Sequence, residues 1–116
     1  MQRDPRAFLW DVRESALAIQ GFVAGMTADN YAANDLVQAG VERKFEIIGE
    51  ALNQLAKADK AIAERIPELP QIVAFRNQLI HGYATVQART VWNVAQTSLP
   101  ALLKCVGALL EELGEN

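Results

Sequence analysis

The apolar residues of this chain recur at helical spacing along its whole length, and this regularity constrains the fold more than any other feature. Phe45, Ile48, Leu52 and Leu55 follow one another at intervals of three or four residues. That spacing places them on one side of an α-helix. No stretch of alternating β-branched residues indicates a strand. The pattern therefore predicts an all-α protein.

Local start and stop signals divide the chain into four main helices. They are expected at residues 5–24, at 35–58, from 68 or 69 to 81, and from about 87 to 113. Shorter helical turns are expected near Tyr31 and within residues 59–65. We find no repeat, low-complexity tract or linker, so the 116 residues are expected to form one domain, a four-to-five-helix bundle.

The ends of these helices carry recognisable capping residues. Asp4 is an N-cap acceptor followed by Pro5 at the first helical position, and Asn34 and Asp59 are placed to cap later helices. Gly82 occupies the usual C-cap position after residue 81. Pro100 falls inside the last predicted helix and is expected to kink it. The buried stripe of the first helix is expected to contain Phe8, Val12, Ile19 and Phe22.

Composition excludes several classes of protein. The single cysteine, Cys105, excludes an internal disulfide and a cysteine-rich zinc site. No apolar run approaches the length of a transmembrane helix, and the N-terminal residues lack a signal-peptide core, so a cytoplasmic protein away from membranes is expected. The formal net charge of −3 argues against a broad, non-specific RNA groove but not against a small catalytic footprint.

Chemistry can be assigned to few side chains, because His81 is the only histidine. One chain cannot form a two-histidine metal site, and neither a metal nor a cofactor is expected. If the protein is an enzyme, His81 is the obvious general acid or base; the alternative is that it caps helix carbonyls. Tyr83 follows Gly82, either as a packing residue or as a hydroxyl beside His81.

Arg76 falls within an apolar arc of the third predicted helix. A guanidinium there needs a carboxylate, a carbonyl or an anionic ligand. It is therefore either a structural arginine, bonded to a helix end or a glutamate, or part of an anion site. His81 lies five residues on, about 140° around the helix, so the two do not share a face. A second subunit would be one way to complete the site.

The strongest motif is the segment Arg76-Asn77-Gln78-Leu79-Ile80-His81-Gly82-Tyr83. It resembles the signature of the HEPN superfamily, in its HepT toxin branch: Arg, four residues, His, one residue, Tyr, commonly with Asn after the Arg. Residues 41–52 resemble the family's preceding long helix, and residues 91–102 resemble its last helix, including the proline. The similarity spans roughly residues 4–113.

This resemblance implies a homodimeric HEPN-type bundle with metal-independent endoribonuclease activity, in which a ribose 2′-hydroxyl attacks the adjacent phosphate of an RNA substrate. Carried over, His81 would move protons, Arg76 would stabilise charge on the phosphoryl oxygens, and Asn77 would orient a phosphate or the histidine. The two subunits would bring their motifs together near the two-fold axis.

The same resemblance implies a partner. In a type VII-like toxin–antitoxin pair, a minimal nucleotidyltransferase antitoxin transfers AMP to the motif tyrosine, here Tyr83, and thereby neutralises the toxin. The sequence leaves two alternatives open. The chain could be a non-catalytic nucleotide- or substrate-binding partner of that transferase, or a purely structural helical dimer.

Overall fold

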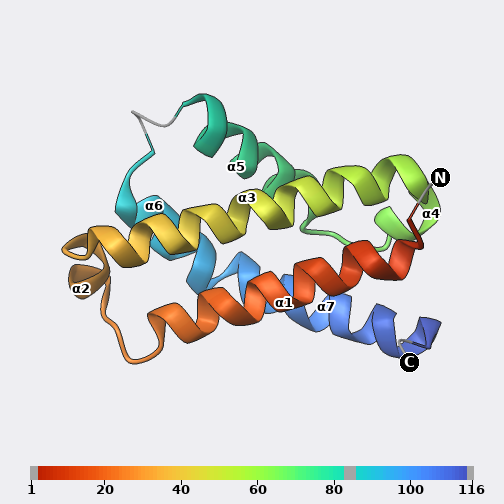
Figure 1. Cartoon of the computed structure of the whole chain (residues 1–116), viewed down its shortest axis with the longest axis horizontal. Helices are drawn as coiled ribbons and strands as arrows, with labels where there is room; N and C mark the ends of the chain where they lie inside the picture. The colour runs from red at the N-terminus through yellow and green to blue at the C-terminus, as the bar shows by residue number, and fades with distance from the viewer. Residues whose placement is uncertain (1–2, 83–85, 115–116) are drawn as a thin grey trace.

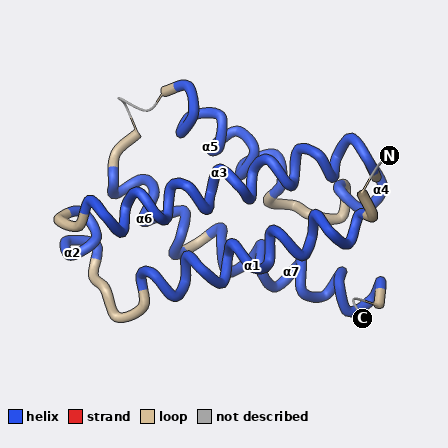
Figure 2. The backbone as a smooth tube through the Cα atoms, viewed as in Figure 1, coloured by secondary structure: helices blue, strands red, loops and turns tan. Residues whose placement is uncertain are grey.

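A computed structural model of the chain describes residues 3–82 and 86–114. Every regular element in that part of the chain is a helix (Figure 2), so the all-α prediction is confirmed. The elements are α1 (Pro5–Val23), α2 (Ala28–Ala32), α3 (Asp35–Ala58), α4 (Lys60–Ala63), α5 (Leu69–His81), α6 (Ala88–Gln96) and α7 (Ser98–Leu113).

The two long helices α1 and α3 lie antiparallel at the centre of the bundle (Figure 1). α7 packs against α1, and α5 packs chiefly against α3 at the opposite edge of the molecule. α6 packs on α2 and α7. Among the described helices this order leaves one side of α5 without a close neighbour, which matters because α5 carries Arg76, Asn77 and His81.

The core forms where the apolar stripes of α1, α3, α5 and α7 meet. The predicted stripe of α3, Phe45 to Leu55, is fully buried, and the Phe45 and Phe75 rings meet edge to face with centroids 5.2 Å apart. On α1, however, Phe22 is 43% exposed and Val23 takes the buried position instead. None of the helices in the described residues is long and apolar enough to cross a membrane.

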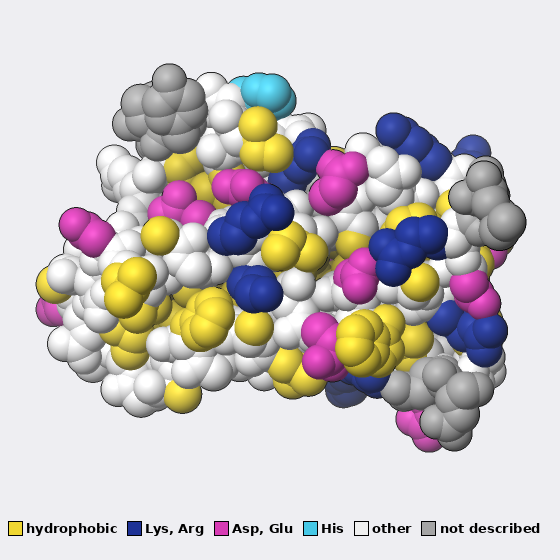
Figure 3. All heavy atoms as spheres, in the orientation of Figure 1, with side chains coloured by type: hydrophobic (Ala, Val, Ile, Leu, Met, Phe, Trp, Pro, Cys, Tyr) yellow, Lys and Arg dark blue, Asp and Glu magenta, His cyan; other side chains and the backbone are white. Residues whose placement is uncertain are grey.

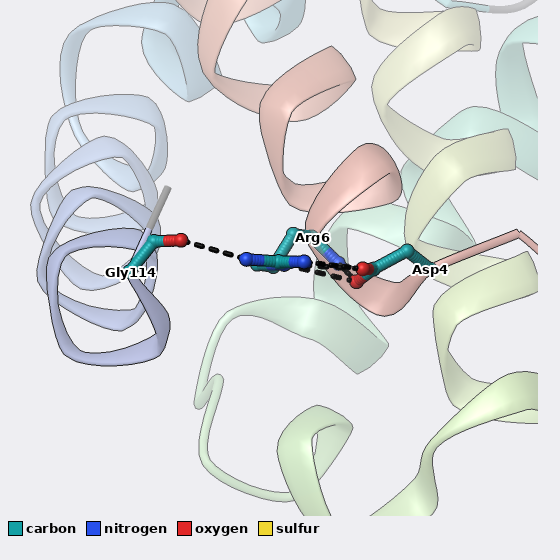
Figure 4. Close-up of polar contacts among 3 residues, drawn as sticks. All are labelled: Asp4, Arg6 and Gly114. Carbon is teal, nitrogen blue, oxygen red and sulfur yellow. Dashed lines mark hydrogen bonds and ion pairs between the residues drawn. The ribbon is translucent and has the colours of Figure 1, made fainter. Parts of the chain in front are cut away.

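The predicted N-caps of α1, α3 and α4 are present. The side chains of Asp4, Asn34 and Asp59 each accept a hydrogen bond from a backbone N–H in the first turn of the helix that follows. Asp4 also binds the Arg6 guanidinium, whose Nη1 donates to the carbonyl oxygen of Gly114 at 2.7 Å (Figure 4). This contact joins the start of α1 to the end of α7.

The last predicted helix is in fact two. α6 ends at Gln96 and α7 begins at Ser98, with Thr97 between them at φ −117° and ψ −70°. Pro100 explains the interruption, because it has no N–H to donate to the carbonyl of Gln96 and its ring crowds that carbonyl. The prediction of a kink within one helix was therefore wrong. The helix ends at Gln96, and a separate helix, α7, begins at Ser98.

Candidate active site

Three buried residues fix α5 on α3 and so decide how the motif is presented. Ile72, Phe75 and Leu79 face the core, while Ile80 is exposed. Arg76 therefore lies at the edge of the buried face rather than in its middle, and its side chain is 21% exposed. From this position the arginine stem contacts α3 and the guanidinium reaches the surface.

The Arg76 guanidinium has two defined partners. Its Nη2 donates to Glu50 Oε2 on α3 at 2.5 Å, and its Nη1 donates to Asn77 Oδ1 at 3.0 Å. Its Nε is buried and has no hydrogen-bond partner among the described residues. Of the partners that the sequence left open for this arginine, the structure shows a carboxylate, and Glu50 is 26 residues away in sequence.

Gly49 allows α5 to approach α3 at this point. A Cβ atom added to Gly49 would lie 2.3 Å from Arg76 Cβ and 2.5 Å from Arg76 Cγ. Those distances are far inside van der Waals contact, and both arginine atoms are close to the backbone, where they cannot swing away. The absence of a side chain at Gly49 therefore lets the Arg76 stem lie directly against α3.

A cleft of about 380 Å³ opens beside this contact, between α1, α3 and α5. Three arginine–carboxylate pairs line it: Arg3 with Asp11 at 3.0 Å, Arg43 with Glu46 at 3.3 Å, and Arg76 with Glu50. Figure 3 shows Lys and Arg side chains interspersed with Asp and Glu on this view of the molecule, rather than gathered in one basic area. The surface therefore suits a local anion contact better than a long phosphate track.

The carboxylates along α3 also influence one another. Burial, together with the charge of Glu46, raises the pKa of Glu42 above its usual range. No group of three or more His, Cys, Asp or Glu side chains in residues 3–82 and 86–114 is placed to hold a metal ion. Two of the carboxylates along α3, those of Glu46 and Glu50, instead form ion pairs with arginine side chains.

His81 lies on a different face of α5 from Arg76. It is the exposed last residue of the helix, and the N–H of Gly82 closes the final turn on the carbonyl of Gln78 at 2.7 Å. No hydrogen bond or ion pair joins Arg76 to His81 within the described chain. In the described residues of the single chain, Arg76 therefore binds Asn77 and lines the cleft, whereas His81 is not among the cleft residues. Tyr83 lies outside the described residues.

The family described as Ribonuclease HepT-like matches residues 12–109. The chain belongs to this family. The matched range includes the segment from Arg76 to Tyr83, which carried the resemblance in the sequence.

Three relatives of this chain align with it over most of their own length. Two proteins of Methanocaldococcus jannaschii, each named "putative RNase", are 32% identical to this chain; one alignment covers 97% of this chain and 92% of the relative, the other 99% and 98%. A Thermococcus cleftensis protein named "probable ribonuclease HepT" is 29% identical, and the alignment covers 88% of this chain and 92% of the relative. No solved structure gives a significant match.

Two residues of the site were missed by reasoning from sequence. Glu50 lies outside the apolar seam of α3, and helical periodicity does not indicate that α5 packs against that side. Gly49 carried a signal that was not used: a glycine inside a long helix costs about 1 kcal/mol relative to alanine, so it usually has a packing reason. Here that reason is the stem of Arg76.

Proposed function

We propose that this protein is an endoribonuclease toxin that cleaves RNA without a metal ion, at a site formed between two copies of the chain. The observation that carries the proposal is the setting of Arg76, held by Glu50 and Asn77 beside an open cleft. Because Nε is buried, the guanidinium fixed in this way offers the remaining N–H groups of its two Nη atoms to an anion. For a member of a ribonuclease family, that anion is the phosphodiester of RNA.

The proposed reaction is a transesterification within the RNA strand. The ribose 2′-oxygen attacks the adjacent phosphorus, and the bond from phosphorus to the 5′-oxygen breaks. His81 of one copy takes the 2′-hydroxyl proton, and His81 of the second copy gives a proton to the leaving 5′-oxygen. Arg76 stabilises the charge on the non-bridging oxygens, while Asn77 orients the guanidinium or the phosphate. The products are a 2′,3′-cyclic phosphate and a 5′-hydroxyl end.

The position of α5 supports a two-copy site. α5 lies at the edge of the bundle, and its outer face, with Ala74, Asn77, Gln78 and His81, is exposed in the single chain. A second copy packed against this face by a two-fold axis would contribute another His81 and another Arg76. Such a dimer would supply both the acid and the base, which one chain with a single histidine cannot do.

Purified protein incubated with RNA in EDTA tests the activity. We expect cleavage by the wild type, products with 5′-hydroxyl ends, and loss of at least about 10²-fold in rate in His81→Ala, because a positioned acid or base contributes about 10²–10⁴-fold. Gel analysis with end-specific labelling measures both the rate and the ends. Nucleotide binding without cleavage of any RNA would instead support a non-catalytic partner of a nucleotidyltransferase.

We further propose that a minimal nucleotidyltransferase antitoxin neutralises the protein by modifying Tyr83. The tyrosine hydroxyl oxygen would attack the α-phosphorus of ATP, pyrophosphate would leave, and the adenylate would add negative charge close to His81 in sequence. After coexpression with the cognate transferase, intact-mass measurement is expected to show added AMP in the wild type and none in Tyr83→Phe. An unmodified wild type would contradict this part of the proposal.

A further inference from the structure

Two consecutive residues of α3 hold both parts of the Arg76 side chain. Gly49 leaves room for the aliphatic stem, whose Cβ and Cγ lie where a glycine substituent would have to be. Glu50 holds the head through Nη2 at 2.5 Å. The long flexible side chain is therefore fixed near its root and at its tip by a helix other than its own.

The remaining donors of the guanidinium are left in a defined direction. Arginine has five N–H groups in a planar fork; one is used by Glu50 and one by Asn77. These two bonds fix the plane of the fork, Nε is buried, and Arg76 lines the cleft. An anion entering the cleft would meet donors whose orientation is already set, so it would not have to order a mobile side chain.

The exposure of Glu50 separates this role from a general contribution to stability. Its side chain is 47% exposed, and an ion pair with a partner that well solvated contributes little to folding, about 0–1 kcal/mol. The fold therefore has little need of this carboxylate. The direction of the Arg76 head depends on it, since Asn77 supplies only one other bond.

We propose that Glu50 is a positioning residue for RNA cleavage, acting through Arg76 to hold the guanidinium in the orientation that receives the scissile phosphate. This inference rests on the proposed ribonuclease function. Glu50 does not touch the reacting atoms. Removal of the Glu50 carboxylate leaves the charge of Arg76 intact but no longer fixes the orientation of its guanidinium. The cleavage step is therefore slowed more than RNA binding is weakened.

The chain offers a matched control in Glu112. It pairs with Arg65 across the fold, with Nη2 to Oε2 at 2.6 Å, and is 56% exposed. Glu112→Ala therefore removes a tertiary arginine–glutamate pair of similar length, whose glutamate is about as exposed as Glu50, away from α5. Both variants change the net charge by the same amount, so any difference between them reflects the arginine concerned.

Steady-state cleavage of RNA by the full chain is the first measurement. We expect Glu50→Ala to lower kcat by about 10- to 100-fold with KM changed less than about threefold, as a misplaced catalytic group does. Glu50→Gln retains an acceptor oxygen and should recover part of kcat, while Glu112→Ala should stay within about twofold of wild type. Equal kcat in Glu50→Ala and Glu112→Ala, both folded by circular dichroism, would overturn the inference.

A second measurement does not depend on RNA cleavage. Phenylglyoxal modifies arginine side chains, and peptide mass analysis gives the rate at Arg76 alone. Loss of the charge-assisted bond to Glu50 should speed modification of Arg76 by about three- to tenfold in Glu50→Ala but not in Glu112→Ala. An unchanged rate would show that Glu50 does not restrain Arg76. An inactive wild type with a faster rate in Glu50→Ala would instead refute the ribonuclease proposal and keep the restraint.

Discussion

Arg76→Ala is expected to lower kcat/KM for RNA cleavage by about 10³-fold or more, the loss typical of removing a guanidinium that stabilises charge on a transferring phosphoryl group. The truncated side chain leaves the α3 contact and offers no donor to the non-bridging oxygens. Arg76→Lys should recover little, because an ammonium keeps the charge but lacks the planar fork that Glu50 and Asn77 orient.

The comparison for this prediction is Arg65→Ala, which removes a guanidinium paired with Glu112 elsewhere in the fold. Single-turnover cleavage in EDTA, with excess protein, measures the chemical step for both variants. Thermal unfolding should show that both variants are folded, with the lower Tm in Arg76→Ala, because that substitution also removes a stem packed against Gly49. If Arg76→Ala and Arg65→Ala cleave RNA equally fast, Arg76 has no part in the reaction.

Helix ends and the central seam were predictable because they depend on near neighbours in the chain. Asp4, Asn34 and Asp59 each cap the helix that follows them, within three residues of the N–H they accept from. The seam from Phe45 to Leu55 is buried as its period requires. The same reasoning wrongly placed Phe22 in the core. After Ile19 the apolar stripe can continue at a three-residue or a four-residue step, and in the structure Val23 is the buried residue.

The site itself was predictable only in part, because its decisive contacts join distant segments. Residue chemistry required a partner for Arg76, and helical geometry separated it from His81, but nothing local to α5 identifies Glu50 on α3. Their pairing depends on how α5 crosses α3, which the Phe45–Phe75 contact and Gly49 together determine. The break at Thr97 is similar. Pro100 predicts that the helix is interrupted, but the direction of α6 relative to α7 depends on the packing of α6 on α2 and α7.

Gly49→Ala is expected to lower the free energy of unfolding by about 1–3 kcal/mol, and the Tm by roughly 4–15 °C, even though alanine is the better helix former by about 1 kcal/mol. The new methyl group would lie 2.3 Å from Arg76 Cβ. Two atoms attached close to two helix backbones cannot both stay in place. α5 must therefore shift away from α3, which loosens the core contacts of Ile72, Phe75 and Leu79.

The matched substitution is Gly107→Ala in α7, where an added Cβ meets no atom within 4 Å and only the helix propensity changes. It should raise the Tm while Gly49→Ala lowers it, measured at one protein concentration because unfolding of the proposed dimer would depend on concentration. Gly49→Ala should also cleave RNA more slowly at temperatures where it is folded, because the shift of α5 moves Arg76 away from Glu50. A Tm for Gly49→Ala that rises like that of Gly107→Ala would mean that α5 does not lie this close to α3.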